Sequence, residues 1–175
     1  MDFVKTVTTA VLFAAMPVWA TDLTVPQSNA IRAAASYLES QPFSKKRLID
    51  QLSSPQGADY DVADASFAVN SLKVDWYKQA VLAAKSYLES QGFSRYRLID
   101  QMSSPAGSGF ELADAKAAVD SLNVDWNQQA VRSAKSYMES QAFSCKGLIR
   151  QLSSSAGSGY TESQATFGAK QAGAC

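Results

Sequence analysis

The stretch SYLESQ at residues 36–41 decides the fold, because the chain repeats it at a fixed distance. It returns unchanged at residues 86–91 and as SYMESQ at residues 136–141. Residues 30–79, aligned without a gap to residues 80–129, are identical at 31 of 50 positions. A fixed period of this size is typical of an array of equal supersecondary units. We therefore predict three tandem repeats of 50 residues, an arrangement that favours binding over a single catalytic pocket.

Each repeat reads as three helices, because apolar residues recur at helical spacing and no alternating strand pattern persists. The first helix is expected after Asp75 and Asp125, which are good N-caps, whereas Pro26 occupies the first turn of the first repeat. The second helix is expected at a serine cap and the third at a polar cap. These caps are Ser44, Ser94 and Ser144, then Asp61, Glu111 and Thr161. The predicted fold class is all-α, with three helix-turn-helix-like, three-helix repeats.

The first 20 residues read as a secretory signal. Lys5 gives a weakly positive start, residues 7–15 are mostly apolar, and Ala20 ends a stretch that suits signal-peptidase cleavage. The apolar stretch is shorter than the roughly 20 residues of a membrane span; an uncleaved amino-terminal anchor is the alternative. We divide the chain into a signal peptide at 1–20 and repeats at 21–76, 77–126 and 127–175.

Trp76 and Trp126 stand where one predicted repeat passes into the next. We interpret them as structural junctions that pack at the seams between repeats. A tryptophan platform for a ligand is the alternative. Tyr37, Tyr87 and Tyr137 recur at helical spacing and are expected in the cores.

The composition argues against several kinds of chemistry. The chain has no histidine, which removes the commonest general base and the usual zinc ligand. Two cysteines cannot form a structural zinc site alone, and residues 106–109 lack the lysine of a phosphate-binding loop. We therefore predict no enzymatic activity, no metal and no cofactor.

Net charge argues against a nucleic-acid partner. Removal of the signal takes Asp2 and Lys5 from totals of 16 acidic and 16 basic residues, which leaves 15 of each. Nucleic-acid affinity rests on neutralisation of phosphates by an excess of Lys and Arg. The charge is uneven, since residues 80–129 hold four basic and six acidic residues and residues 130–175 hold five and two. Faces with different partners, or drift on a solvated surface, would both give this asymmetry.

Basic residues cluster in the second helix of each repeat, on the side that the apolar stripe leaves free. We predict that they form the surface that faces a partner, with simple solubility as the alternative. They are Lys45, Lys46, Arg47, Arg95, Arg97, Lys146 and Arg150.

The two cysteines occupy equivalent positions in the repeat. Cys145 stands where the earlier repeats have Lys45 and Arg95, and Cys175 stands where they have Asp75 and Asp125. If the repeats share one fold, these three pairs are spatially equivalent. We predict two surface ion pairs and a disulfide between Cys145 and Cys175, which an exported protein can form. Free thiols or an intermolecular bridge are the alternatives.

Five segments of the third repeat carry a family resemblance. They are AVDSLNVDWNQQA at 118–130, SYM at 136–138, FS at 143–144, GLI at 147–149 and QLS at 151–153. Together they resemble the repeat of the host cell surface-exposed lipoprotein (Ltp-type) family. The resemblance covers essentially all of residues 25–175 and implies short tandem helix-turn-helix-like units.

The resemblance also implies a function. Known members of the family are prophage-encoded superinfection-exclusion proteins, which act outside the cytoplasmic membrane and block entry of phage DNA. A protein partner is implied, such as an injected phage protein. Family lipoproteins carry a lipid-modified cysteine just after the signal, where this chain has Thr21. We therefore expect a periplasmic or secreted protein without a stable membrane anchor after cleavage, with a cell-wall or surface-adhesion module as the alternative function.

Overall fold

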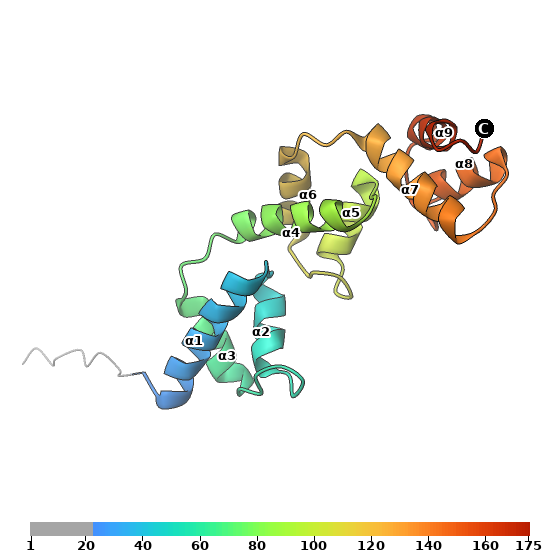
Figure 1. The fold of residues 1–175 in the computed structure, drawn as a ribbon. Helices are drawn as coiled ribbons and strands as arrows, with labels where there is room; N and C mark the ends of the chain where they lie inside the picture. Colours follow the sequence, from blue (N-terminus) through green and yellow to red (C-terminus); the bar gives the residue numbers. More distant parts are fainter. Residues whose placement is uncertain (1–22) are drawn as a thin grey trace, which may run out of the picture.

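A computed structural model describes residues 23–175, and every regular element in this range is an α-helix (Figure 1). The helices form three groups of three, which confirms the predicted all-α array of three-helix repeats. The first repeat contains α1 (Val25–Ser40), α2 (Lys45–Ser53) and α3 (Val62–Ser71). The second contains α4 (Trp76–Ser90), α5 (Arg95–Ser103) and α6 (Leu112–Ser121). The third contains α7 (Trp126–Ser140), α8 (Cys145–Ser153) and α9 (Glu162–Gln171). The predicted signal peptide lies outside the described residues.

Capping side chains start most of the helices at the predicted residues, but Asp61 and Glu111, which precede α3 and α6, make no side-chain capping hydrogen bond. Ser44 accepts a hydrogen bond from the backbone N–H of Arg47 over 3.1 Å, and the equivalent serines cap α5 and α8 in the same way. Asp75 caps α4 through the N–H of Lys78. Thr161 forms a reciprocal capping box at the start of α9. Such a cap stabilises a helix by about 1 kcal/mol, so each capped start is fixed by local sequence.

Each repeat has its own apolar core between its three helices. In the middle repeat Leu98 and Met102 of α5 are fully buried among alanines of α4 and α6. Burial of one such side chain contributes about 1.5–3 kcal/mol. The rings of Tyr87 and Phe93 meet edge to face, with 5.7 Å between centroids, and the equivalent rings in the other repeats meet at 6.0 and 5.8 Å. The repeats are therefore packed to one plan.

Two tryptophans mark the passage between repeats. Trp76 is the first residue of α4, yet it packs against the core of the first repeat. Trp126 is the first residue of α7 and packs against the core of the second repeat. Each indole therefore fixes the point at which the chain leaves one repeat for the next.

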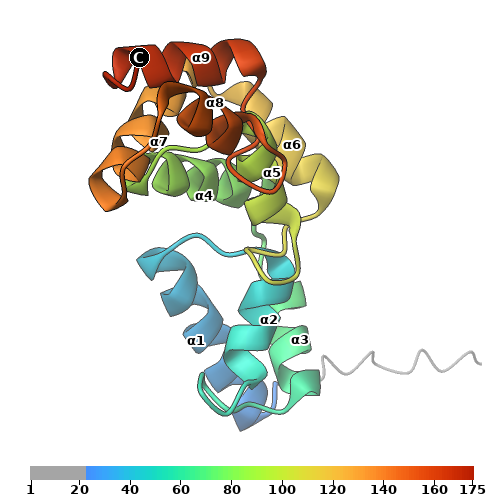
Figure 2. The same cartoon turned by 90° about the vertical axis from the view of Figure 1, so that its right-hand side faces the viewer.

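A loop from the second repeat docks onto the first (Figure 2). This loop joins α5 to α6 and lies against the start of α2. Ser44 Oγ donates to the backbone oxygen of Ser108 over 2.6 Å. The Arg47 guanidinium donates to the backbone oxygens of Gly107 and Pro105 over 2.9 and 2.6 Å. The loop is thus held through its main chain rather than its side chains.

The third repeat docks onto the second in the same way. Ser94 Oγ donates to the backbone oxygen of Ser158 over 2.6 Å, and Arg97 Nε donates to that of Gly157 over 2.9 Å. The turn needs glycine at Gly159, where φ is +66° and an added Cβ would lie 2.7 Å from the Tyr96 ring. Left-handed backbone is costly for residues with a Cβ. Position 159 therefore requires glycine for both conformation and close approach.

Cys145 and Cys175 form a disulfide, which confirms the pairing that the repeat alignment predicted. Their Cα atoms are 4.9 Å apart and they are separated by 30 residues in sequence. The bridge ties the segment after α9 to the start of α8. Ala174, the residue before Cys175, packs against the core of the third repeat.

The ion pairs predicted at the equivalent positions are wrong. Within residues 23–175, neither Lys45 nor Arg95 pairs with the expected aspartate. The carboxylates of Asp75 and Asp125 instead accept hydrogen bonds from the N–H groups at the starts of α4 and α7. Arg95 pairs with Asp120 of α6 at 2.6 Å. The capping role of the two aspartates therefore takes precedence over the predicted pairs.

The third repeat contains a buried hydroxyl pair. Ser133 Oγ and Tyr160 Oη are 2.8 Å apart, and Tyr160 is only 3% exposed. Burial raises the pKa of Tyr160 to about 12, so its hydroxyl stays protonated at physiological pH. The second repeat has Ala83 and Phe110 at these two positions.

We expect Ser133→Ala to lower the free energy of unfolding by about 1–3 kcal/mol, because the Tyr160 hydroxyl stays buried without its partner. Adding Tyr160→Phe should recover most of this loss, since the double variant reproduces the Ala83 and Phe110 pair of the second repeat. Urea denaturation of both single variants and the double variant measures the coupling energy. Purely additive losses would contradict this expectation.

Candidate binding clefts between repeats

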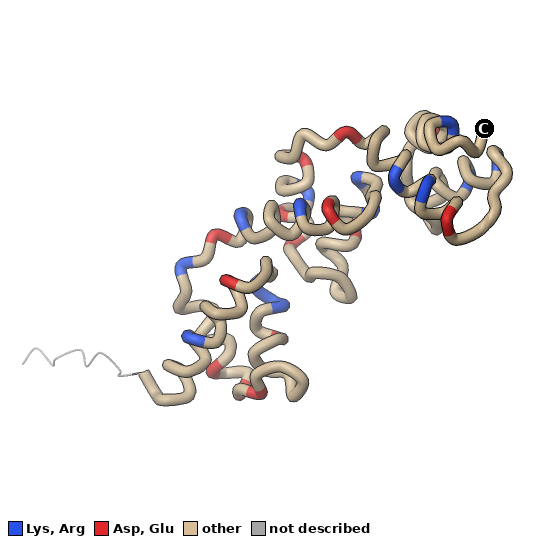
Figure 3. The backbone as a smooth tube through the Cα atoms, in the orientation of Figure 1, with Lys and Arg blue, Asp and Glu red and all other residues tan. Residues whose placement is uncertain are grey.

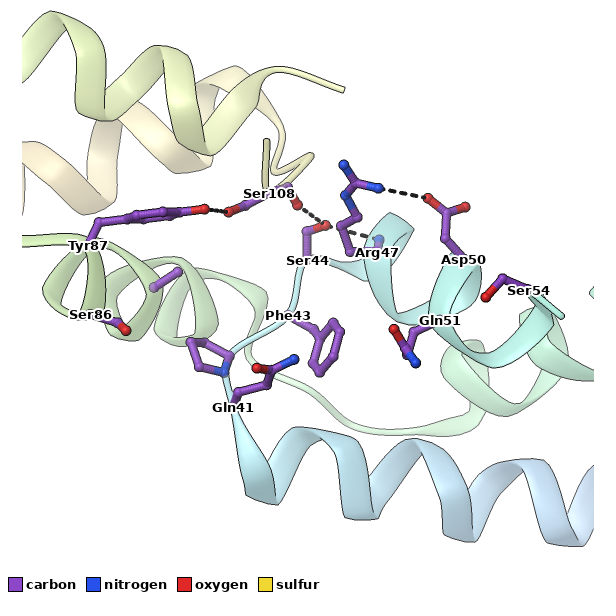
Figure 4. Close-up of a pocket in the computed structure, with 12 residues that line it drawn as sticks. Gln41, Phe43, Ser44, Arg47, Asp50, Gln51, Ser54, Ser86, Tyr87 and Ser108 are labelled. Carbon is purple, nitrogen blue, oxygen red and sulfur yellow. Dashed lines mark hydrogen bonds and ion pairs between the residues drawn. The ribbon is translucent and has the colours of Figure 1, made fainter. Parts of the chain in front are cut away.

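A cleft of about 510 Å³ lies between the first and second repeats (Figure 4). One wall comes from α2 and the segment before it, and contains Gln41, Arg47 and Gln51. The opposite wall comes from α4 and contains Ser86 and Tyr87. Amide and hydroxyl groups of these residues lie beside apolar surface from Pro42, Phe43 and Ala83. Such a surface can donate and accept hydrogen bonds along a polypeptide.

A chain of hydrogen bonds forms the inner side of this cleft. Tyr87 Oη and Ser108 Oγ are 2.7 Å apart, and Ser44 Oγ donates to the backbone oxygen of Ser108 (Figure 4). Gln101 Nε2 lies 3.4 Å from Tyr87 Oη and donates to it. These contacts join α2, α4 and the docking loop. The cleft is therefore a built recess that depends on two repeats at once.

Charge in the cleft is balanced. Asp50 lies within 4.0 Å of Arg47 and within 2.6 Å of Lys46, so its carboxylate has cationic partners on its own helix. The Arg47 guanidinium also holds the docking loop. The lining therefore suits a neutral or mixed-charge segment rather than a polyanion.

A second cleft of about 380 Å³ lies between the second and third repeats. Eleven of its lining positions are equivalent, at a spacing of 50 residues, to positions that line the first cleft, and nine of these eleven are identical. The two exceptions are Gly92 in place of Pro42 and Ser133 in place of Ala83. The array therefore holds two copies of one recess.

The structure gives two of the predicted basic residues a role that the sequence did not indicate. Arg47 and Arg97 hold the docking loops of the following repeats and line the two clefts. Between 30% and 36% of each side chain remains exposed. They are thus both seam residues and cleft residues.

The other five predicted basic residues lie on α2, α5 and α8. Basic residues are spread along the whole array (Figure 3). Lys46 pairs with Asp50, and Arg95 pairs with Asp120. The remaining three are exposed: they are Lys45, Lys146 and Arg150. The five do not line either cleft. Their role toward a partner stays a prediction.

The docking loops are the functional elements that sequence reasoning missed. The sequence of residues 106–109 indicates only that a phosphate-binding motif is absent there. The available signal was the pair of glycines, Gly109 and Gly159, at equivalent positions in a Ser-Gly segment of two repeats. Repeated glycines at one turn position indicate a close backbone approach.

Within residues 23–175, no group of three or more His, Cys, Asp or Glu residues is placed to hold a metal ion. None of the helices in this range is both long enough and apolar enough to cross a membrane.

Fold and clefts together define a helical repeat protein whose recesses lie at the seams between its units. The chain belongs to the host cell surface-exposed lipoprotein family, whose pattern matches residues 26–72, 75–122 and 125–171. These three matches follow the three structural repeats. The family's name implies a surface-exposed, extracellular-facing protein. No curated protein and no solved structure shows a significant match to the chain.

Proposed function

We propose that this protein acts outside the cytoplasmic membrane as a protein-binding module that excludes superinfecting phage. Its partner is a phage protein delivered with the genome, and binding prevents entry of the DNA. The observation that supports the protein-binding part of the proposal is the repeated seam cleft. Two near-identical recesses in one array can engage two segments of one partner, which raises affinity through a high effective concentration.

The chemistry of the clefts supports a polypeptide partner. Hydroxyl and amide groups from Ser86, Gln41 and Gln51 can pair with a partner's main chain, and Arg47 with Asp50 keeps the recess near neutral. The balanced charge of the chain, 16 basic and 16 acidic residues, argues against phosphate recognition. The proposed action on phage rests on the resemblance to the family.

Filling both clefts should abolish protection. We expect Ser86→Trp together with Ser136→Trp to raise plaque counts on expressing cells by about tenfold or more, since a blocked cleft needs to cost only about 1.4 kcal/mol for a tenfold loss of binding. Both serines are exposed and line the clefts, so an indole can occupy the recess without disturbing a core. Phage plating efficiency is the measurement.

Ser36→Trp is the matched control. Ser36 is equivalent to Ser86 and Ser136 and is also exposed, but it lines neither cleft. This variant should protect cells as well as the unmodified protein. Equal loss of protection in the control and in the cleft variant would contradict the proposal that the partner binds in the clefts.

The step of infection at which the protein acts distinguishes phage exclusion from cell-wall adhesion. Phage should still adsorb to expressing cells, while release of DNA into the cytoplasm falls. If a broad phage panel plates equally well with and without the protein, exclusion is wrong. Retention of the purified protein on peptidoglycan would then favour a cell-wall adhesion module.

A further inference from the structure

The third repeat exposes the surface that its two predecessors use to hold a docking loop. Ser44 and Ser94 are only 2% exposed, because the loop of the following repeat covers them. The equivalent Ser144 is exposed. Phe143 is half-buried, whereas Phe93 is buried. The start of α8 is therefore an uncovered copy of a surface that binds a loop in both seams.

The first repeat exposes the matching loop. Asp59 stands at the position of the docking glycines Gly109 and Gly159, and its φ of +54° is close to their +63° and +66°. Its backbone N–H donates to the oxygen of Ser54 over 3.2 Å, as that of Gly109 does within its own loop. The loop therefore has the docking conformation, although no other repeat within residues 23–175 holds it. Asp59 is exposed, and its neighbour Tyr60 is half-buried.

The two uncovered surfaces are complementary in charge. A Cβ added at Gly109 would lie 3.6 Å from Ser44 Oγ and 3.8 Å from Lys46 Cδ. If the loop of one copy took the same position on α8 of another, Asp59 would replace Gly109, and Ser144 and Lys146 would replace Ser44 and Lys46. The aspartate carboxylate would then face a hydroxyl and an ammonium group.

The third repeat also has room for this side chain. Gly147 stands where Arg47 and Arg97 stand in the other repeats. The Cγ of Arg47 lies 3.7 Å from the Cβ that Gly109 lacks, so an arginine there would crowd an aspartate. Among residues 23–175, no carboxylate lies in salt-bridge contact with Lys146, and no cation with Asp59. The disulfide at Cys145 leaves Ser144 exposed.

We propose that copies of this chain associate head to tail, with the first-repeat loop of one copy on α8 of the next. The contact between molecules has the same geometry as the contact between repeats. The ion pair of Asp59 with Lys146 replaces the hydrogen bonds that Arg47 and Arg97 donate to the docking loops. Such an assembly extends the row of clefts. The inference does not depend on phage exclusion.

Sedimentation velocity of the disulfide-bonded protein over a wide range of concentrations tests the proposal. We expect species larger than the monomer at high concentration, and fewer of them at high salt, because a surface ion pair is screened. Asp59→Lys alone and Lys146→Glu alone should each weaken the association by about tenfold or more, since each places like charges together. Lys116→Glu makes the same charge change in the middle repeat and should have no effect.

Mixing the two charge-reversal variants gives the sharpest outcome. The loop of the Asp59→Lys variant meets a glutamate on its partner, and the loop of the Lys146→Glu variant meets a lysine, so the mixture should regain the association that each has lost. A monomer at every concentration overturns the proposal. So does an association that Asp59→Lys leaves unchanged, or one that the mixture does not restore.

Discussion

Replacing both Cys145 and Cys175 with serine should lower the free energy of unfolding of the third repeat by about 3–4 kcal/mol. The disulfide closes a loop of 30 residues. Without this cross-link the unfolded chain gains conformational entropy, which stabilises the unfolded state by about 3–4 kcal/mol. The two substitutions leave the contacts within the first two repeats unchanged. We therefore expect the variant to unfold in two steps, the third repeat first.

The two junction tryptophans allow these steps to be separated. Trp76 reports on the core of the first repeat and Trp126 on that of the second, so tryptophan fluorescence of protein that starts at Thr21, and so lacks Trp19, follows the first two repeats. Far-ultraviolet circular dichroism follows the helices of all three. In the double serine variant the dichroism transition should begin at lower urea than the fluorescence transition. Reduction of the unmodified protein should reproduce this separation, whereas coincident transitions at an unchanged midpoint would contradict the prediction.

Features set by neighbouring residues could be predicted from the sequence. Ser44 accepts its capping bond from a backbone N–H three residues away, and the capping box of Thr161 with Gln164 spans the same distance. The disulfide was predictable for another reason. The repeat alignment placed Cys145 at the position of Lys45 and Arg95, and Cys175 at the position of Asp75 and Asp125, so the pairing followed from comparing repeats rather than from neighbouring residues.

The seams could not be predicted, because they depend on residues about 60 positions apart. Arg47 reaches the backbone oxygen of Gly107, and a backbone acceptor leaves no mark in the side-chain pattern. From the sequence alone, Arg47 beside Lys45 and Lys46 is predicted to be a solvent-exposed surface residue. Its contact with the loop of the next repeat is evident only in the structure. The predicted ion pair of Lys45 with Asp75 was also wrong, because the Asp75 carboxylate accepts a hydrogen bond from the backbone N–H of Lys78 at the start of α4. The clefts are a property of two repeats together and follow from the seams.

Loss of the two seam arginines should uncouple the repeats. We expect Arg47→Ala with Arg97→Ala to lower the stability of each seam by about 2 kcal/mol, because each substitution removes charged hydrogen bonds to two backbone oxygens. We use the lower part of the usual range for the stability contribution of a charged hydrogen bond, because about a third of each arginine side chain is exposed. In a linear array, stability is a sum of repeat terms and neighbour terms, so weaker seams make unfolding less cooperative.

The slope of unfolding free energy against urea measures this loss. A cooperative array exposes the surface of all three repeats in one transition, whereas uncoupled repeats unfold over a wider range and give a smaller apparent slope. Arg95→Ala is the matched control, because Arg95 lies on the same helix as Arg97 but pairs with Asp120 inside its own repeat. Such an exposed pair contributes only about 0–1 kcal/mol, so the slope should stay unchanged. A double variant that keeps the full slope would mean that the other contacts, among them the hydrogen bonds of Ser44 and Ser94, hold the seams without the arginines.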